Sequence, residues 1–155
     1  AQDIQEFLGV EKFEKFFKFC FVRNPWDRMV SLYHYARETG IRRTKERGLK
    51  LNAFQQNVVE NSFSDWILTG KLGPPQTSWF LSARGQLLVD FIGRLERIDE
   101  DLQKLSKILD IDFSTNLHKA NTTKRESYQN YYNDTTRQII AEKFAKEIEL
   151  FGYEF

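Results

Sequence analysis

Apolar and polar positions fall into blocks along the chain, and these blocks predict both strands and helices. Residues 16–22, FFKFCFV, form a nearly continuous apolar run with one lysine, which is the pattern of a strand buried on both faces. An amphipathic run follows at once, and Asn24 as N-cap with Pro25 at the first helical position predicts a helix to about residue 38. Residues 87–96 form the second strand candidate. The order strand, then helix, is typical of α/β proteins.

The rest of the chain predicts mainly helices. Further helices are expected over 52–68, 99–111 and 134–150. Residues 1–15 fit a short amphipathic helix or turn with a break at Gly9. The basic segment 38–50 contains Gly40 and Gly48 and is expected to be a mobile surface loop. Two strands between long helices predict a parallel sheet, although two strands are few for such a sheet.

Length and charge place the protein among single globular domains, here residues 1–155. Hydrophobic residues make up 41% and aromatic residues 15% of the chain, which is enough to build a core. The 23 basic and 22 acidic residues give a net charge of +1, so no global charge favours a nucleic-acid partner or an acidic membrane. No apolar stretch reaches the roughly 18 residues of a transmembrane segment, and no signal pattern opens the chain. A cytoplasmic location is therefore expected.

Cysteine and metal chemistry have little support in the sequence. Cys20 is the single cysteine, which excludes a disulfide within the chain, and its apolar surroundings favour an inert thiol over a nucleophile. No pair of carboxylates or histidines has the spacing of a metal site, so no metal is predicted. Glu96 and Asp101 are interpreted as structural carboxylates that cap the following helix or pair with nearby arginines.

Arg23 and Ser31 are the main candidates for a binding site. Arg23 ends the first strand, where open α/β sheets place their ligands, and Ser31 lies two turns into the following helix. An arginine, a hydroxyl and free backbone N–H groups at the helix start would suit a phosphate. The pattern equally fits an ion pair between Arg23 and Asp27 that closes the turn, with Ser31 as a plain surface hydroxyl. Spacing alone leaves both interpretations open.

Three blocks, in order, resemble one known family. FVRNPWDRMVSLYHY, residues 21–35, resembles the 3′-phosphate-binding segment of sulfotransferases that use 3′-phosphoadenosine 5′-phosphosulfate (PAPS). DFIGRLERIDEDLQKLSKILDI, residues 90–111, resembles the family's strand-and-helix block. Residues 131–155, ending in FGYEF, resemble its C-terminal helix and closing motif. The resemblance covers residues 16–155 and is of the carbohydrate-sulfating type.

The resemblance implies a fold, a reaction and site residues. The fold would be a P-loop-containing nucleoside triphosphate hydrolase-like three-layer αβα sandwich with a parallel sheet, lacking its N-terminal βα unit. The reaction would transfer a sulfuryl group from PAPS, the co-substrate, to an acceptor hydroxyl, with a carbohydrate as acceptor. Arg23 and Ser31 would hold the ribose 3′-phosphate. Arg125, with its neighbour Lys124, falls where members often place a basic residue near the nucleotide.

Two parts of the family pattern are not found in this sequence. The 22 residues before Arg23 contain no lysine followed by small residues and Ser or Thr, which is the loop that holds the 5′-phosphosulfate. The catalytic base is unknown: His34 is a candidate, but His34 and His118 both fit ordinary surface histidines. A non-catalytic domain that binds a 3′-phosphoadenosine nucleotide is therefore the alternative. An apolar strand edge without a neighbour also predicts a homodimer.

Overall fold

The structure, a computed structural model, describes residues 1–113 and 126–155. These residues form two compact units. The sheet unit comprises residues 1–23 and 74–113, and the helical unit comprises residues 24–73 and 126–155. No described helix combines the length and apolar character needed to span a membrane.

The sheet unit contains two short parallel strands and several helices. Its elements are α1 (Gln2–Leu8), α2 (Val10–Glu14), β1 (Phe19–Val22), α6 (Thr77–Phe80), β2 (Phe91–Arg94), the 3₁₀ helix η1 (Leu95–Arg97) and α7 (Ile98–Leu109). The predicted parallel pairing is confirmed, with register Phe19↔Phe91 to Val22↔Arg94, although both strands are shorter than the sequence pattern indicated. Gly9, at a φ of 78°, separates α1 from α2 as expected.

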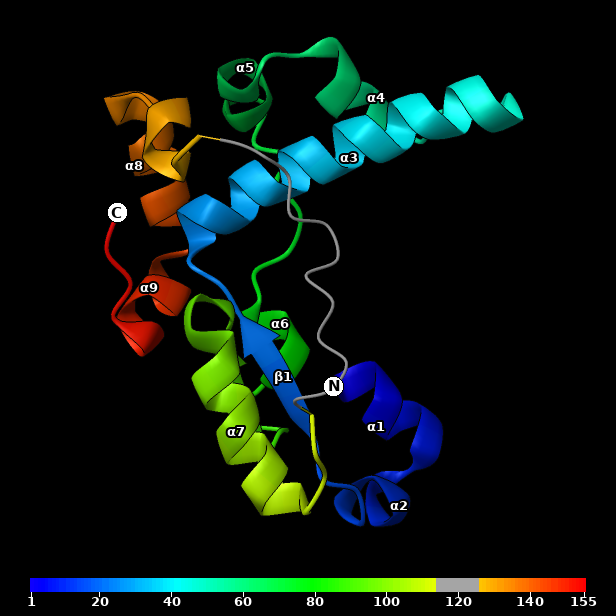
Figure 1. Cartoon of the computed structure of the whole chain (residues 1–155), viewed down its shortest axis with the longest axis vertical. Helices are drawn as coiled ribbons and strands as arrows, with labels where there is room; N and C mark the ends of the chain where they lie inside the picture. The colour runs from blue at the N-terminus through cyan, green and yellow to red at the C-terminus, as the bar shows by residue number, and fades with distance from the viewer. Residues whose placement is uncertain (114–125) are drawn as a thin grey trace. The chain divides into compact units, whose positions relative to one another are not determined.

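α7 and a buried glycine fix the packing of the small sheet. Leu105 is fully buried and Leu102 nearly so, and α7, which is labelled in Figure 1, packs against β2. Gly93 stands opposite Phe21 in the register, and the Phe21 ring covers it so closely that a Cβ at residue 93 would collide with the ring. Glycine is therefore required at this position because a neighbouring side chain occupies the space of its Cβ.

The helical unit is built around one long helix. Its elements are α3 (Pro25–Arg47), α4 (Ala53–Glu60), α5 (Phe63–Leu68), the 3₁₀ helix η2 (Tyr128–Tyr131), α8 (Asp134–Lys143) and α9 (Ala145–Phe151). The predicted apolar face of α3 is confirmed, since Trp26, Met29, Val30 and Tyr33 are all buried. Val58, Trp66, Ile67 and Ile140 complete the core of this unit and are each fully buried.

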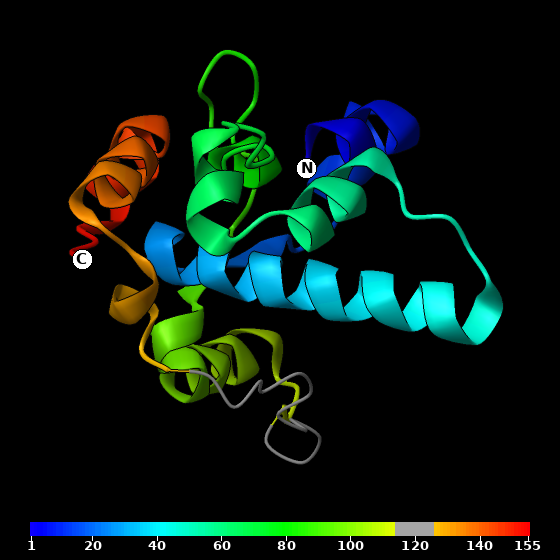
Figure 2. The same cartoon turned by 90° about the horizontal axis from the view of Figure 1, so that it is seen from above.

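The predicted loop over residues 38–50 is wrong, because α3 continues through most of it to Arg47 (Figure 2). Gly40 is a packing residue and not a helix break: a Cβ there would lie 3.1 Å from Leu51 Cδ2 and 3.5 Å from Val59 Cγ2. The helix ends at Gly48, which adopts the left-handed conformation at a φ of 60°. The sequence pattern predicted a loop at both glycines, but Gly40 packs within the helix and Gly48 ends it.

Two predicted helices are each divided in the structure. The helix expected over 52–68 breaks at Asn61, and the Ser62 side chain caps α5 by accepting from Asp65 N at 3.2 Å. The helix expected over 134–150 breaks at Phe144, whose φ of −112° and ψ of 24° are not helical. Phe144 is almost fully buried, so its side chain contributes to the core at the junction of α8 and α9. The short helix α6 was not predicted.

Candidate functional site

Arg23 lies directly after β1, at the carboxyl end of the parallel sheet, as the sequence predicted. The buried side chain of Gln76 holds its backbone at two points. Arg23 N donates to Gln76 Oε1 at 3.0 Å, and Gln76 Nε2 donates to Arg23 O at 2.8 Å. The sequence does not reveal Gln76 as a site residue, because the preceding Pro74 and Pro75 indicate only a turn and no local pattern reveals a partner 53 residues away.

The start of α3 differs from the prediction of free backbone N–H groups. The Asn24 side chain caps the helix: its Oδ1 accepts from Trp26 N at 3.0 Å and from Asp27 N at 3.4 Å. Pro25 has no N–H, and Arg28 N donates to Asn24 O at 2.8 Å. The expectation is therefore wrong, because the predicted N-cap uses the donors that an anion would need. A phosphate at this point would have to be bound by side chains.

The C-terminal residues stabilise the first turn of α3 within the helical unit. Asn24 Nδ2 donates to Glu154 O at 2.8 Å, and the Phe155 ring packs edge-on against Trp26 with centroids 5.6 Å apart. Tyr132 Oη donates to Trp26 O at 2.8 Å. The C-terminal motif FGYEF thus contacts the start of α3, and Trp26 is a buried core residue.

The other predicted site residues have different outcomes. Ser31 is half-buried in the second turn of α3, which belongs to the helical unit. Arg23 belongs to the sheet unit and is the last residue of its first segment, residues 1–23. His34 is half-buried, and its ring makes an edge-to-face contact with Tyr131 at 5.2 Å between centroids. The roles of Ser31 and His34 stay predictions. Lys124, Arg125 and His118 lie outside the described residues.

A buried charged contact in the helical unit was not predicted. Glu147 on α9 is fully buried, and the Arg28 guanidinium lies over the Phe144 ring, 5.5 Å from its centroid. Burial lowers the pKa of Arg28 from its ordinary value, and the nearby charge of Glu147 acts in the opposite direction. Removing one of two buried opposite charges is strongly destabilising, because the other is left uncompensated. We assign this contact a structural role at the junction of α8 and α9 with α3.

Asp101 confirms the prediction of a structural carboxylate. Its side chain is almost fully buried and accepts from Arg94 N at 2.8 Å, Arg97 Nε at 3.1 Å and Lys104 Nζ at 2.7 Å. Burial alone would raise the pKa of Asp101, but the hydrogen bonds from these three donors together lower it below its ordinary value. Asp101 therefore fixes the end of β2 to the first turn of α7.

The Cys20 thiol is predicted to react slowly. Burial raises its pKa to about 11, so the thiol stays protonated at pH 8 in the folded protein. An unfolded cysteine has a pKa of about 8.5, and iodoacetamide should therefore alkylate Cys20 about a hundredfold faster in urea than in buffer. Mass spectrometry of timed samples at pH 8 measures both rates. Equal rates in the two conditions would contradict an inert thiol and reopen the nucleophile interpretation.

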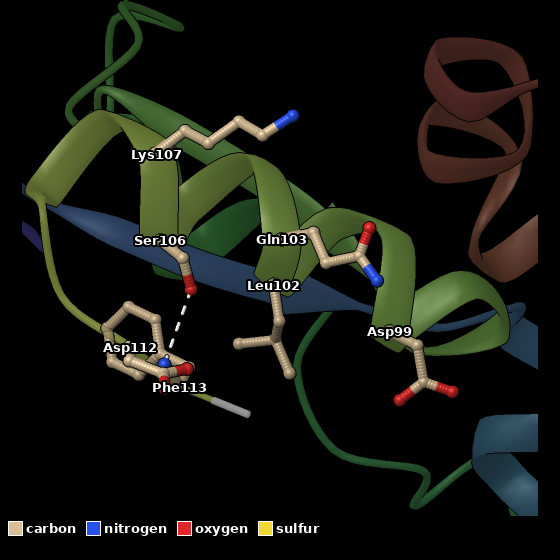
Figure 3. Close-up of a pocket in the computed structure, with 7 residues that line it drawn as sticks. All are labelled: Asp99, Leu102, Gln103, Ser106, Lys107, Asp112 and Phe113. Atoms are coloured by element: carbon tan, nitrogen blue, oxygen red, sulfur yellow. Dashed lines mark hydrogen bonds between the residues drawn. The ribbon is translucent and has the colours of Figure 1, made fainter. Parts of the chain in front are cut away.

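Two of the cavities lie in the described part of the sheet unit, and neither contains a predicted site residue. One, of about 580 Å³, runs along α7 and is lined by Asp99, Leu102, Gln103, Ser106, Lys107, Asp112 and Phe113 (Figure 3). Ser106 Oγ accepts from Phe113 N at 3.3 Å beside it. The other, of about 360 Å³, is mainly apolar and includes Cys20 and Trp79. Among the described residues, no group of three or more His, Cys, Asp or Glu side chains could hold a metal ion.

A parallel strand followed in sequence by an arginine and then by a capped helix has the strand-to-helix order of α/β proteins. Comparison with known proteins makes this more specific. The family model described as "Sulfotransferase family" matches residues 3–154, and the chain belongs to this family. No solved structure matches the chain significantly.

Two relatives show how far the similarity extends. The chain is 29% identical over 126 residues to an uncharacterised protein of Archaeoglobus fulgidus, covering 81% of this chain and 93% of that protein. It is 26% identical over 174 residues to carbohydrate sulfotransferase 12 of Mus musculus. That alignment covers 92% of this chain and 41% of the mouse protein, so the chain spans less than half the length of this relative.

Proposed function

We propose that the protein is a sulfotransferase that binds PAPS and transfers its sulfuryl group to a hydroxyl of a carbohydrate acceptor. The observation that carries the proposal is Arg23, which directly follows β1 and has its backbone fixed by buried Gln76. Arg23 and Ser31 are separated by seven residues that lead straight into α3, and we assign both to the ribose 3′-phosphate. The P-loop-like three-layer fold is part of the same proposal.

The proposed reaction is an in-line displacement at sulfur. The acceptor oxygen forms a bond to sulfur while the bond from sulfur to the bridging oxygen breaks, and adenosine 3′,5′-bisphosphate leaves. Arg23, whose guanidinium forms charge-assisted hydrogen bonds, binds the nucleotide end with Ser31, and Arg125 and Lys124 add positive charge near it. A base takes the acceptor proton, and His34 is the candidate, held edge-on by Tyr131.

A carbohydrate acceptor is supported by the name of the mouse relative and by a basic surface. The C-terminal part of α3 and the residues after it are exposed and carry five cations: Arg42, Arg43, Lys45, Arg47 and Lys50. Because the whole chain has a net charge of only +1, this is a local positive surface, which would help an anionic acceptor approach. The homodimer stays a prediction, based on the short sheet and on the exposed Phe16 and Phe19.

The alternative predicted from the sequence is a nucleotide-binding domain without catalysis. Residues 1–22 form α1, α2 and β1, and they contain no loop with a lysine and small residues that could hold the 5′-phosphosulfate. Gly9 and Lys12 are both exposed, and Lys12 is not followed by small residues and a Ser or Thr. The alternative predicts nucleotide binding with no transfer.

A transfer assay distinguishes these functions. The chain is incubated with radiolabelled PAPS and a mixture of neutral and acidic oligosaccharides, and labelled sugars are separated from the donor. Protein-dependent labelling that disappears in Arg23→Ala supports the transferase. Binding of adenosine 3′,5′-bisphosphate without labelled sugar supports the non-catalytic domain. If the chain neither labels a sugar nor binds this nucleotide, both proposals fail.

A further inference from the structure

We propose that Gln76 is a positioning residue for the nucleotide site. Its buried carboxamide fixes the backbone of Arg23 and therefore the point from which the Arg23 side chain extends. The inference rests on the proposed function, because it takes Arg23 as the ligand of the 3′-phosphate. Gln76 itself does not contact the nucleotide in this proposal. Gln76 acts by holding Arg23 in the position from which its side chain reaches the 3′-phosphate.

The contact between the two residues defines both the place and the orientation of the Arg23 backbone. The N–H and the C=O of Arg23 both bind the carboxamide of Gln76, at 3.0 and 2.8 Å. Pairing between β1 and β2 ends at Val22↔Arg94, so Arg23 lies one residue beyond the last strand pair. The Gln76 side chain thus replaces the neighbouring strand at the point where the sheet no longer fixes the chain.

Gln76 is itself held firmly enough to do this. It is 1% exposed, it follows Pro74 and Pro75, and it precedes α6, whose Phe80 is also 1% exposed. Ser78 Oγ donates to Pro75 O at 2.6 Å across the start of this helix. Proline rings and a buried aromatic anchor leave the Gln76 backbone little freedom, so its carboxamide has a fixed position within the sheet unit.

A fixed backbone matters because arginine is long and flexible. Binding a phosphate immobilises the side chain, and each additional degree of freedom that must be ordered weakens binding. Residues that lock a ligand-binding side chain therefore contribute to affinity without touching the ligand. The contribution should apply to the 3′-phosphate and not to the rest of the nucleotide, and this makes it measurable.

The test compares two nucleotides that differ only in the 3′-phosphate. Calorimetry gives the affinities for adenosine 3′,5′-bisphosphate and for adenosine 5′-monophosphate, and their ratio is the 3′-phosphate preference. In Gln76→Leu, which keeps the size and removes both hydrogen bonds, we expect this preference to fall about tenfold. The affinity for the monophosphate should change much less. A preference equal to that of the wild type would overturn the inference.

Two further variants keep the test decisive. Gln55→Leu is the matched control, because Gln55 is also a buried glutamine but serves the capping box of α4, and it should leave the preference unchanged. If Gln76→Leu does not fold by circular dichroism, Gln76→Glu replaces it: the acceptor for Arg23 N remains and the donor to Arg23 O is lost. Gln76→Glu should then lower the preference as well, and an unchanged preference again overturns the inference.

The measurement on the wild type shows whether the proposed function or only the positioning role of Gln76 has failed. A wild type without any 3′-phosphate preference contradicts the proposed function, and the Gln76 inference falls with it. A wild type that prefers the bisphosphate, combined with an unchanged preference in the Gln76 variants, contradicts only the positioning role. The proposed function then stands on Arg23 and Ser31.

Discussion

Replacing Arg23 with alanine should weaken the binding of adenosine 3′,5′-bisphosphate by about a hundredfold, because charge-assisted hydrogen bonds to a phosphate are among the strongest polar contacts in proteins. Arg23 follows β1 at the carboxyl end of the sheet, and its backbone is already fixed by Gln76. Melting temperature measured against nucleotide concentration reports the loss, since a ligand stabilises only the folded chain that binds it. The wild type should be stabilised and Arg23→Ala should not.

The control for this prediction is another arginine of the sheet unit. Arg84 is exposed, its backbone N–H donates to Ser82 Oγ, and no role in the site is proposed for it. Arg84→Ala should retain the full nucleotide-dependent shift. The nucleotide-dependent shift of Arg23→Lys should lie between those of the wild type and Arg23→Ala, because lysine keeps the charge but loses the planar two-point contact. Equal shifts in wild type and Arg23→Ala would show that Arg23 does not hold the phosphate.

Replacing Asp101 with alanine should lower the free energy of unfolding by about 3 kcal/mol, because three donors lose their buried acceptor. The Asp101 side chain is only 2% exposed and binds Arg94 N, Arg97 Nε and Lys104 Nζ. Arg97 and Lys104 are about half exposed and can return to water, but the Arg94 backbone N–H belongs to the end of β2. Urea unfolding followed by circular dichroism measures the change.

The same carboxylate should give the protein a specific sensitivity to acid. The pKa of Asp101 is lower in the folded chain than its ordinary value, so its contribution to stability is complete above about pH 4, the pKa of an unfolded aspartate. That contribution is lost as the pH falls further. Asp101→Asn should therefore flatten the loss of stability between neutral and acid pH, while Asp99→Asn, at an exposed position of the same turn, should not. An unchanged acid profile in Asp101→Asn would contradict this account.

The features that sequence predicts well here are those with a local cause. Asn24 and Pro25 predict the start of α3 because capping and proline geometry act within a few residues, and the buried face of that helix follows from its apolar spacing. The parallel pairing of β1 and β2 follows from the helical segments between two apolar strands. Asp101 was recognised as structural because it stands among arginines at a helix start.

The features that sequence did not predict depend on contacts between distant segments. Gln76 binds Arg23 across 53 positions of sequence, and nothing near Gln76 indicates this. Gly40 looks like a loop residue until Leu51 and Val59 are found beside it, where a larger residue would prevent close packing with α4. The free donors expected at the start of α3 are absent from the described site because Asn24, correctly predicted as the cap, already uses them.

Calorimetry of the wild-type chain with adenosine 3′,5′-bisphosphate and adenosine 5′-monophosphate tests the central claim most directly. The claim is that the segment from Arg23 to Ser31 binds a nucleotide through its 3′-phosphate. It predicts saturable one-to-one binding of the bisphosphate with an affinity at least about a hundredfold higher than that of the monophosphate, which is the contribution assigned to Arg23. Absence of binding, or equal affinities for the two nucleotides, would contradict it.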